Sequence, residues 1–108
     1  MLNLDHAFAA LADPTRRAIL ARLGQGEATV LELASPFAIS QPAVSRHLKV
    51  LEDAGLILRR IDGAKRPCRI VPEALNELDE WLQKLQEVLG ANYKRLDDVL
   101  FQLSEEEN

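Results

Sequence analysis

One capped helix in the middle of the chain constrains the fold more than any other segment. In the stretch SQPAVSRHLKVLEDAG, Ser40 is an N-cap residue, Pro42 lies in the first turn, where its missing N–H costs nothing, and Gly55 follows as a C′ residue. At about 100° per residue, the apolar side chains of the segment share one face. These side chains are Val44, Leu48 and Leu51. The sequence therefore predicts a helix from about Gln41 to Ala54 with one face packed on a core.

The chain before this helix carries the signals of three shorter helices. Apolar residues recur at helical spacing over Leu4–Leu11. Pro14 follows an aspartate, which places an N-cap before a proline at the first helical position and favours a second helix. Thr29 and Glu32 have the spacing of a capping box and predict a third helix, which Pro36 should end.

Strand signals and one long helix complete the pattern. The runs Leu56–Ile61 and Pro67–Val71 flank an Asp-Gly turn and predict a β-hairpin. A last helix should follow from residue 73 to about residue 103. Its continuity at Gly90 stays open, because glycine costs about 1 kcal/mol relative to alanine in a helix. The fold class is mainly α with a β-hairpin wing. The order α-α-α-α-β-β-α predicts one winged helix-turn-helix domain over residues 1–108.

Charge is distributed unevenly along the chain, whose formal net charge is −4. From Arg16 to Arg69 there are ten Lys and Arg against five Asp and Glu, a local balance of +5. The remaining residues have three against twelve, a balance of −9. An acidic protein can therefore still present a basic surface to a polyanion, and double-stranded DNA is the partner we expect.

The composition is that of a globular protein, with 47% apolar and 28% charged residues. No stretch approaches the roughly 18 apolar residues that cross a bilayer, and the segment MLNLDHAFAALAD lacks the basic start of a signal peptide. Cys68 is the only cysteine, so it forms no internal disulfide. We expect a cytoplasmic protein with no membrane partner.

Short polar and basic side chains on the capped helix and the hairpin are the candidate DNA contacts. A serine reaches phosphates or base edges, an arginine can bond two acceptors of guanine, and cations at a hairpin tip can bind phosphate. The candidates are Ser40, Gln41, Pro42, Ser45, Arg46, His47, Lys49, Arg60, Lys65 and Arg66. For His47, at the edge of the apolar face, a packed and hydrogen-bonded histidine is the favoured alternative. A solvated face remains the alternative for the helix charges, and a charged strand edge for Arg59 or Arg69.

Leucines at seven-residue spacing run along the last helix and alternate with a second apolar series three residues on. Such a seam is typical of helices that pair between subunits, and it is longer than so small a domain needs to cover itself. We therefore predict a homodimer; the alternative is one face packed on the domain's own core. The predicted dimer contacts are Leu75, Leu78, Leu82, Leu85, Leu89 and Leu96.

Three segments together resemble one family of regulators. The stretches ALADPTRRAILARL, SQPAVSRHLKVLEDAGLI and VPEALNELDEWL are similar to the ArsR/SmtB-type winged-helix transcriptional repressors, and most of all to a subgroup of small autorepressors that lack metal sites. The resemblance implies a homodimer that binds an operator, with the fourth helix as the recognition helix and the hairpin as the wing. We expect that operator to be an inverted repeat.

Other functions find little support in the sequence. The Cys-x-Cys metal motif of some family members is replaced by Leu31-Glu32-Leu33, and Glu73–Leu103 contains no histidine, so we expect no metal site and no cofactor. The sequence has no Ser-His-Asp set and no Gly-rich phosphate loop, so it does not predict an enzyme. Cys68 remains a candidate redox switch, and a small-molecule or protein effector is not identified. The alternative function is a winged-helix protein–protein interaction module with an acidic partner.

Overall fold

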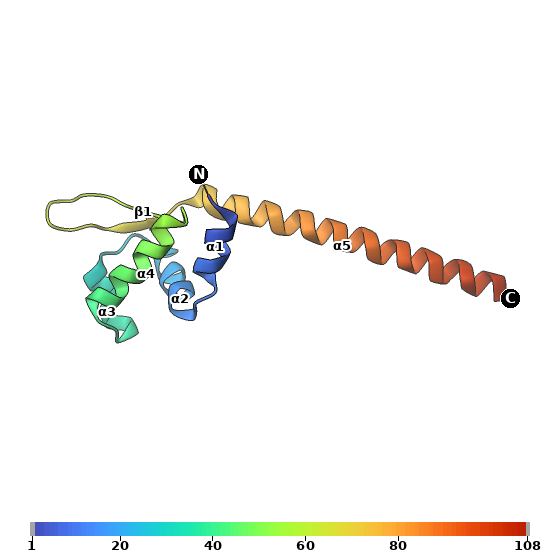
Figure 1. Cartoon of the computed structure of the whole chain (residues 1–108), viewed down its shortest axis with the longest axis horizontal. Helices are drawn as coiled ribbons and strands as arrows, with labels where there is room; N and C mark the ends of the chain where they lie inside the picture. The colour runs from blue at the N-terminus through green and yellow to red at the C-terminus, as the bar shows by residue number, and fades with distance from the viewer. Residues whose placement is uncertain (1, 108) are drawn as a thin grey trace. The chain divides into compact units, whose positions relative to one another are not determined.

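The computed structural model describes residues 2–107, apart from the side-chain surroundings of residues 93 and 105–107. Its elements follow the predicted order (Figure 1). They are α1 (Leu4–Leu11), α2 (Pro14–Leu23), α3 (Val30–Phe37), α4 (Gln41–Asp53), β1 (Ile57–Arg59), β2 (Cys68–Ile70) and α5 (Pro72–Glu107). The predicted winged helix-turn-helix fold, mainly α with a β-hairpin, is confirmed. The chain divides into two compact units, Met1–Asn76 and Glu77–Asn108, so the expectation of one domain stays a prediction.

The helix N-termini form where the caps predict them. The Asp13 carboxylate accepts a hydrogen bond from the Arg16 backbone N–H at 3.0 Å, and the Ser40 hydroxyl accepts one from the Ala43 N–H at 3.2 Å. At the start of α3, Thr29 and its partner three residues on form a complete capping box. Each cap satisfies a backbone donor that the first helical turn leaves without a partner.

The end of α3 differs from the prediction by one residue. The helix continues past Pro36 to Phe37, so the proline lies inside the last turn and does not stop it. The chain then leaves the helix through Ala38, whose φ of 54° is left-handed. Glycine or asparagine usually occupies such a position, since a Cβ makes it unfavourable, and the sequence therefore gave no sign of where the helix ends.

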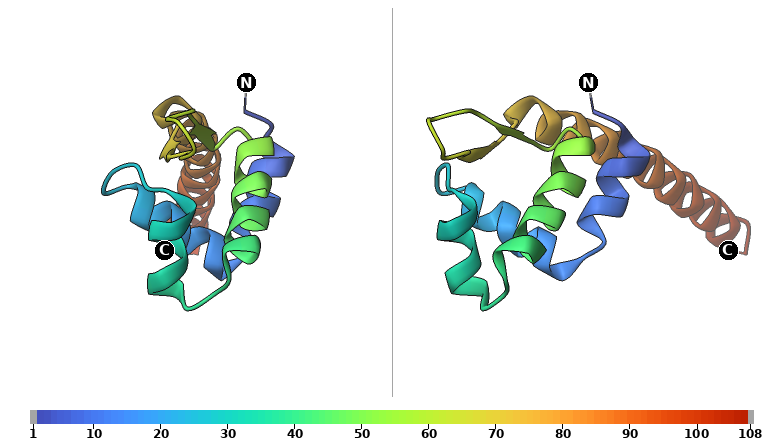
Figure 2. Two further views of the ribbon diagram at one scale, coloured as in Figure 1. Left: turned by 90° about the vertical axis from the view of Figure 1, so that its left-hand side faces the viewer. Right: turned by 60° about the vertical axis from the view of Figure 1, so that its left-hand side comes forward.

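The core of the first unit forms around α4, which packs against α1, α2, α3 and β1. In the right-hand view of Figure 2, α4 lies between α1 and α3. The predicted apolar face of α4 is fully buried, together with apolar side chains from the neighbouring elements. These side chains are Val44, Leu48, Leu51, Ile19, Leu33, Leu56 and Ile57. Because α4 is held on one side by the core, its opposite face remains exposed.

The two strands of the hairpin are shorter than predicted, but the backbone remains paired up to the tip of the hairpin. The antiparallel register places Ile57 opposite Ile70 and Arg59 opposite Cys68. Beyond the strands, the backbone of residues 62 and 65 forms two hydrogen bonds of 3.0 and 2.9 Å. Gly63, with a φ of 60°, is therefore the first central residue of the turn, as in a type II′ hairpin. The tip is thus a tight two-residue turn.

The helix α5 is continuous from Pro72 to Glu107 and passes through Gly90. The sequence left the continuity of this helix at Gly90 open, and the structure shows no break there. The helix extends four residues past the predicted end. A penalty of about 1 kcal/mol is too small to interrupt a helix whose flanking residues favour helix on both sides. Ala74 and Leu78 are its buried residues within the described part of the chain. Across residues 2–107, each helix is too short or too polar to cross a membrane.

Candidate nucleic-acid interface

The exposed face of α4 carries the polar residues that the sequence singled out. Gln41, Pro42, Arg46 and Lys49 are exposed, and Ser45 is half-buried. Within residues 2–107 the structure gives the Arg46 guanidinium no hydrogen bond and no ion pair. Lys49 forms an exposed ion pair at 3.4 Å with the carboxylate one turn on. An exposed pair of this kind contributes little, so both cations are available to an incoming polyanion.

His47 lies on the flank of this face and already has a partner. The residue is half-buried, and its Nδ1 lies 3.4 Å from Nη1 of Arg16 in α2. The favoured alternative from the sequence, a packed and hydrogen-bonded histidine, agrees with this geometry. A contact between His47 and DNA stays a prediction.

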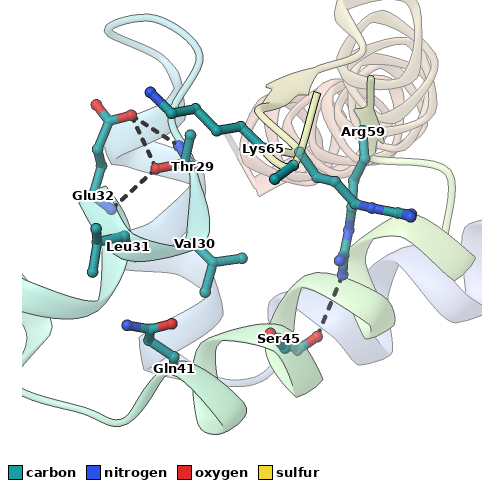
Figure 3. A pocket seen from close by; sticks show the side chains of 10 residues that line it. Thr29, Val30, Leu31, Glu32, Gln41, Ser45, Arg59 and Lys65 are labelled. Atoms are coloured by element: carbon teal, nitrogen blue, oxygen red, sulfur yellow. Dashed lines mark hydrogen bonds between the residues drawn. The ribbon is translucent and has the colours of Figure 1, made fainter. Parts of the chain in front are cut away.

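Arg59 connects the base of the wing to α4. Its Nη2 donates to the Ser45 carbonyl oxygen at 3.4 Å (Figure 3). Its Nε lies 3.8 Å from a carboxylate oxygen of Glu52. The side chain is 20% exposed, so it faces the domain. The sequence offered only a charged strand edge as its role. The one available signal was strand alternation, because it places the side chains of Arg59 and the next residue on opposite faces of the hairpin.

Arg60 points to two carboxylates. Its guanidinium donates to both carboxylate oxygens of Glu27, at 2.6 and 3.3 Å, and lies 3.7 Å from Asp62. The hydrogen bond from Arg60 lowers the pKa of Glu27 below its usual value, and the same bond raises the pKa of Arg60. In the free protein, Glu27 thus competes with phosphate for Arg60, one of the predicted DNA contacts. Its contact with DNA stays a prediction.

The tip of the wing carries Lys65 and Arg66, both exposed. No hydrogen bond or ion pair engages either cationic group in the part of the chain that the structure describes. The two residues border an open groove of about 550 Å³ between the wing, the start of α3 and the first half of α4 (Figure 3). The groove is lined by Thr29, Val30, Leu31, Glu32, Gln41, Ser45, Arg59, Ala64, Lys65 and Arg66. The exposed cations of the wing and the start of the recognition helix therefore border one surface.

This arrangement suits recognition of a helical polyanion. A helix with an exposed arginine can enter a major groove, where guanine offers two acceptors, while cations beside it bind the phosphate backbone. Ser40, the N-cap of α4, is exposed at the end of the helix that would approach the duplex first. The geometry therefore provides separate groups for positioning and for base recognition.

Within residues 2–107, no three His, Cys, Asp or Glu side chains are placed to hold a metal ion. Cys68 is fully buried in β2, and its Sγ lies 3.7 Å from the Arg66 carbonyl oxygen. Burial raises the pKa of this thiol above its usual value, which lowers the fraction of reactive thiolate.

The predicted dimer contacts lie along α5. Leu78 is buried within the single chain, so it has little surface left for a partner. The other five leucines are between 42% and 54% exposed, and at helical periodicity they form one stripe. They are Leu75, Leu82, Leu85, Leu89 and Leu96. Their contact with a second copy stays a prediction.

Comparisons with known proteins place the chain in a family. Residues 11–60 match the family model described as a helix-turn-helix domain. The HTH-type transcriptional regulator Rv2034 of Mycobacterium tuberculosis is 43% identical over 94 residues, covering 87% of this chain and 88% of that protein. A crystal structure of an ArsR family transcriptional regulator, 43% identical, superimposes with a TM-score of 0.74 over 82% of this chain and 96% of that one.

A solution structure from Mycobacterium bovis is also similar. It is described as a homodimeric winged helix-turn-helix DNA-binding domain of a possible ArsR-family regulator, and it is 28% identical with a TM-score of 0.65 over 78% of each chain. The relatives are thus matched over most of their length as well as over most of this chain. With the predicted motifs in place on the predicted fold, the chain belongs to the ArsR/SmtB family of winged-helix, DNA-binding transcriptional regulators.

Proposed function

We propose that this protein is a homodimeric repressor that binds an inverted-repeat operator through α4 and the wing. One observation carries the proposal. The exposed cations Arg46, Lys65 and Arg66 have no partner among the described residues and lie on α4 and the wing, and the two wing residues border a groove that reaches α4. Residues 1–108 would act as one functional domain in the cytoplasm, where the operator is accessible.

Each group of side chains has a separate task in this proposal. Arg46 is the base-recognising residue, because its free guanidinium can bond two acceptors of one guanine in the major groove. Gln41 and Ser45 lie on the flank of α4 that borders the groove and provide shorter polar contacts. Lys65 and Arg66 bind backbone phosphates, which fixes the position of the protein on the duplex and carries no sequence information.

The two-fold symmetry of the dimer matches that of an inverted-repeat operator. An isolated helix cannot bury its own side chains, so the half-exposed leucine stripe of α5 requires a partner, and a second copy of the chain has the same stripe. The M. bovis domain, which is homodimeric, supports the same arrangement here. Two recognition helices related by a two-fold axis would contact half-sites about one helical turn apart, on an inverted repeat. A dimer on such a site would block transcription by occupying the promoter.

The test uses DNA that flanks the protein's own coding region. An inverted repeat from this region should bind a dimer of the chain at physiological salt by about 10³-fold or more over a scrambled duplex of equal length. The affinity should fall linearly with salt on a log–log scale. Equal affinity for both duplexes, combined with binding to an acidic protein, would replace the proposal with the interaction-module alternative.

A further inference from the structure

Arg16 occupies an unusual position among three helices. Its Nε donates to the Ala10 carbonyl oxygen at 2.7 Å and its Nη2 to that of Ala9 at 3.3 Å, both in the last turn of α1. Its Nη1 lies 3.9 Å from the Asp13 carboxylate, which caps α2. The side chain is only 18% exposed. These three contacts hold the guanidinium in place from α1 and from the start of α2.

The Arg16 guanidinium also contacts α4. Nη1 lies 3.4 Å from Nδ1 of His47, a residue 31 positions away in the sequence. A guanidinium has only donors and stays charged, so the ring nitrogen that faces it must accept. The ring nitrogen that bears a proton is then Nε2. Nε2 can therefore donate a hydrogen bond to an acceptor.

The position of His47 on α4 defines what this donor can meet. The residue follows Arg46 and lies about 100° around the helix from it, at the edge between the exposed and the buried face. His47 is half-buried on this flank. If α4 enters the major groove, we expect such a side chain to approach the sugar-phosphate backbone and not the base edges. Phosphate oxygens are acceptors only, which matches an Nε2–H donor.

We propose that Arg16 is a positioning residue of the DNA-binding surface, which holds His47 in the Nε2–H tautomer so that His47 donates to a backbone phosphate. The inference rests on the proposed operator binding and deepens it. His47 then supplies a contact that is equal for all sequences, next to a residue that distinguishes them. Arg16 never touches DNA in this arrangement.

The tautomer is tested first, in the full-length free protein without DNA. Long-range ¹H–¹⁵N NMR spectra at neutral pH should show His47 protonated on Nε2 alone. Arg16→Lys should shift the ring towards a mixture of tautomers, because a lysine cannot serve the α1 carbonyls and His47 together. The matched control is Arg17→Lys, since Arg17 binds the Leu11 carbonyl oxygen and leaves His47 unchanged. Protonation on Nδ1 in the wild type, or the same tautomer in Arg16→Lys, would overturn the role of Arg16.

The phosphate contact is tested with two variants of His47. A glutamine places its amide near the position of Nε2, while an asparagine places it near Nδ1. His47→Asn should therefore weaken binding about tenfold on both the operator and the scrambled duplex, while His47→Gln stays within about threefold of the wild type. Equal losses for both variants, or a loss confined to the operator, would overturn the contact.

A combined variant separates positioning from folding. Arg16→Lys should weaken binding in the wild type and cause no further loss in the His47→Asn background, because its effect passes through the ring. Additive losses would show a general structural role and overturn the inference. If the wild type bound no inverted repeat, the proposed function and the phosphate contact would both fall. The tautomer in the free protein would still decide whether Arg16 positions His47.

Discussion

Arg60 and Glu27 join the wing to the segment before α3 through two hydrogen bonds, at 2.6 and 3.3 Å. The pair links residues 33 positions apart, and Asp62 lies 3.7 Å from the same guanidinium. In the free protein the charge of Arg60 is thus balanced locally. Because both partners are exposed, a phosphate can compete for the guanidinium with little cost.

Glu27→Gln should strengthen DNA binding for all sequences. The substitution removes a carboxylate that competes with phosphate for Arg60, so the log–log salt slope should steepen by up to about one. Fluorescence anisotropy at several salt concentrations measures both quantities, with Glu80→Gln on α5 as the matched loss of one charge. An unchanged affinity and slope would show that Arg60 does not approach DNA.

The same substitution should change the response of stability to acid. The pKa of Glu27 is lowered from 4.5 by the hydrogen bond from Arg60, so ionised Glu27 stabilises the folded chain. This contribution is complete above pH 4.5 and is lost as the pH falls through the lower folded-state pKa. The difference in Tm between wild type and Glu27→Gln should therefore shrink on acidification, measured by circular dichroism. A constant difference at all pH values would contradict the cause assigned to the shift.

Arg46→Ala and the wing variants should fail in different ways. Loss of Arg46 should weaken operator binding by about 1–3 kcal/mol and relax the preference at one or two base pairs in each half-site. Lys65→Ala and Arg66→Ala should weaken binding to every sequence similarly and flatten the salt dependence. Competition binding with single-base operator variants distinguishes the two effects, and Arg95→Ala on α5 is the control. Similar losses of selectivity from the helix and the wing would disprove this division.

Leu89→Glu should convert the dimer to monomer. A glutamate in the leucine stripe would place an unpaired charge in the interface, which costs several kcal/mol, on the order of a broken buried pair. Sedimentation velocity should show the monomer, with the helical signal retained and operator affinity lost. The matched control is Ala91→Glu, which adds the same charge on the opposite side of α5 and should remain dimeric. A dimeric Leu89→Glu variant with normal DNA binding would show that the stripe is not the dimer contact.

Cys68 should be unreactive in the folded protein. Its burial and raised pKa leave little accessible thiolate, so alkylation should proceed much more slowly than in urea. Intact-mass spectrometry follows the reaction with iodoacetamide under both conditions. Operator affinity should also be unchanged after mild peroxide treatment. Rapid labelling of the native chain, with loss of DNA binding, would restore the redox-switch interpretation.

The sequence predicted the helices best where the signals are local. Ser40, Gly55 and the capping box at Thr29 each act within a few residues, so the spacing alone determines the boundary. Pro36 misled the prediction, because a proline is tolerated in a last turn. Gly90 left the continuity of α5 undecided, and in the structure this one glycine does not interrupt the long helix. The left-handed residue that ends α3 is an alanine, for which no local rule exists.

The candidate site was predictable in its exposed cations and not in their partners. The exposure of Arg46, Lys65 and Arg66 could be predicted from helical periodicity and from their place at the turn. Within the described residues, no other side chain binds their cationic groups. The most distant partners of Arg16, Arg59 and Arg60 lie 31, 14 and 33 residues away in the sequence. Only the packing of α2, α4, the wing and the segment before α3 brings these pairs together, and no pattern along the chain predicts them.

The hydrogen bond from Arg59 to the Ser45 carbonyl oxygen joins the base of the wing directly to α4. Since the base of the wing is fastened to the recognition helix, the span between the two is set by the protein and not by the duplex. A DNA segment must then match that span with its own groove width or be deformed to do so. Sequences that differ only in stiffness, at base pairs that no side chain touches, would be distinguished by the energy of that deformation.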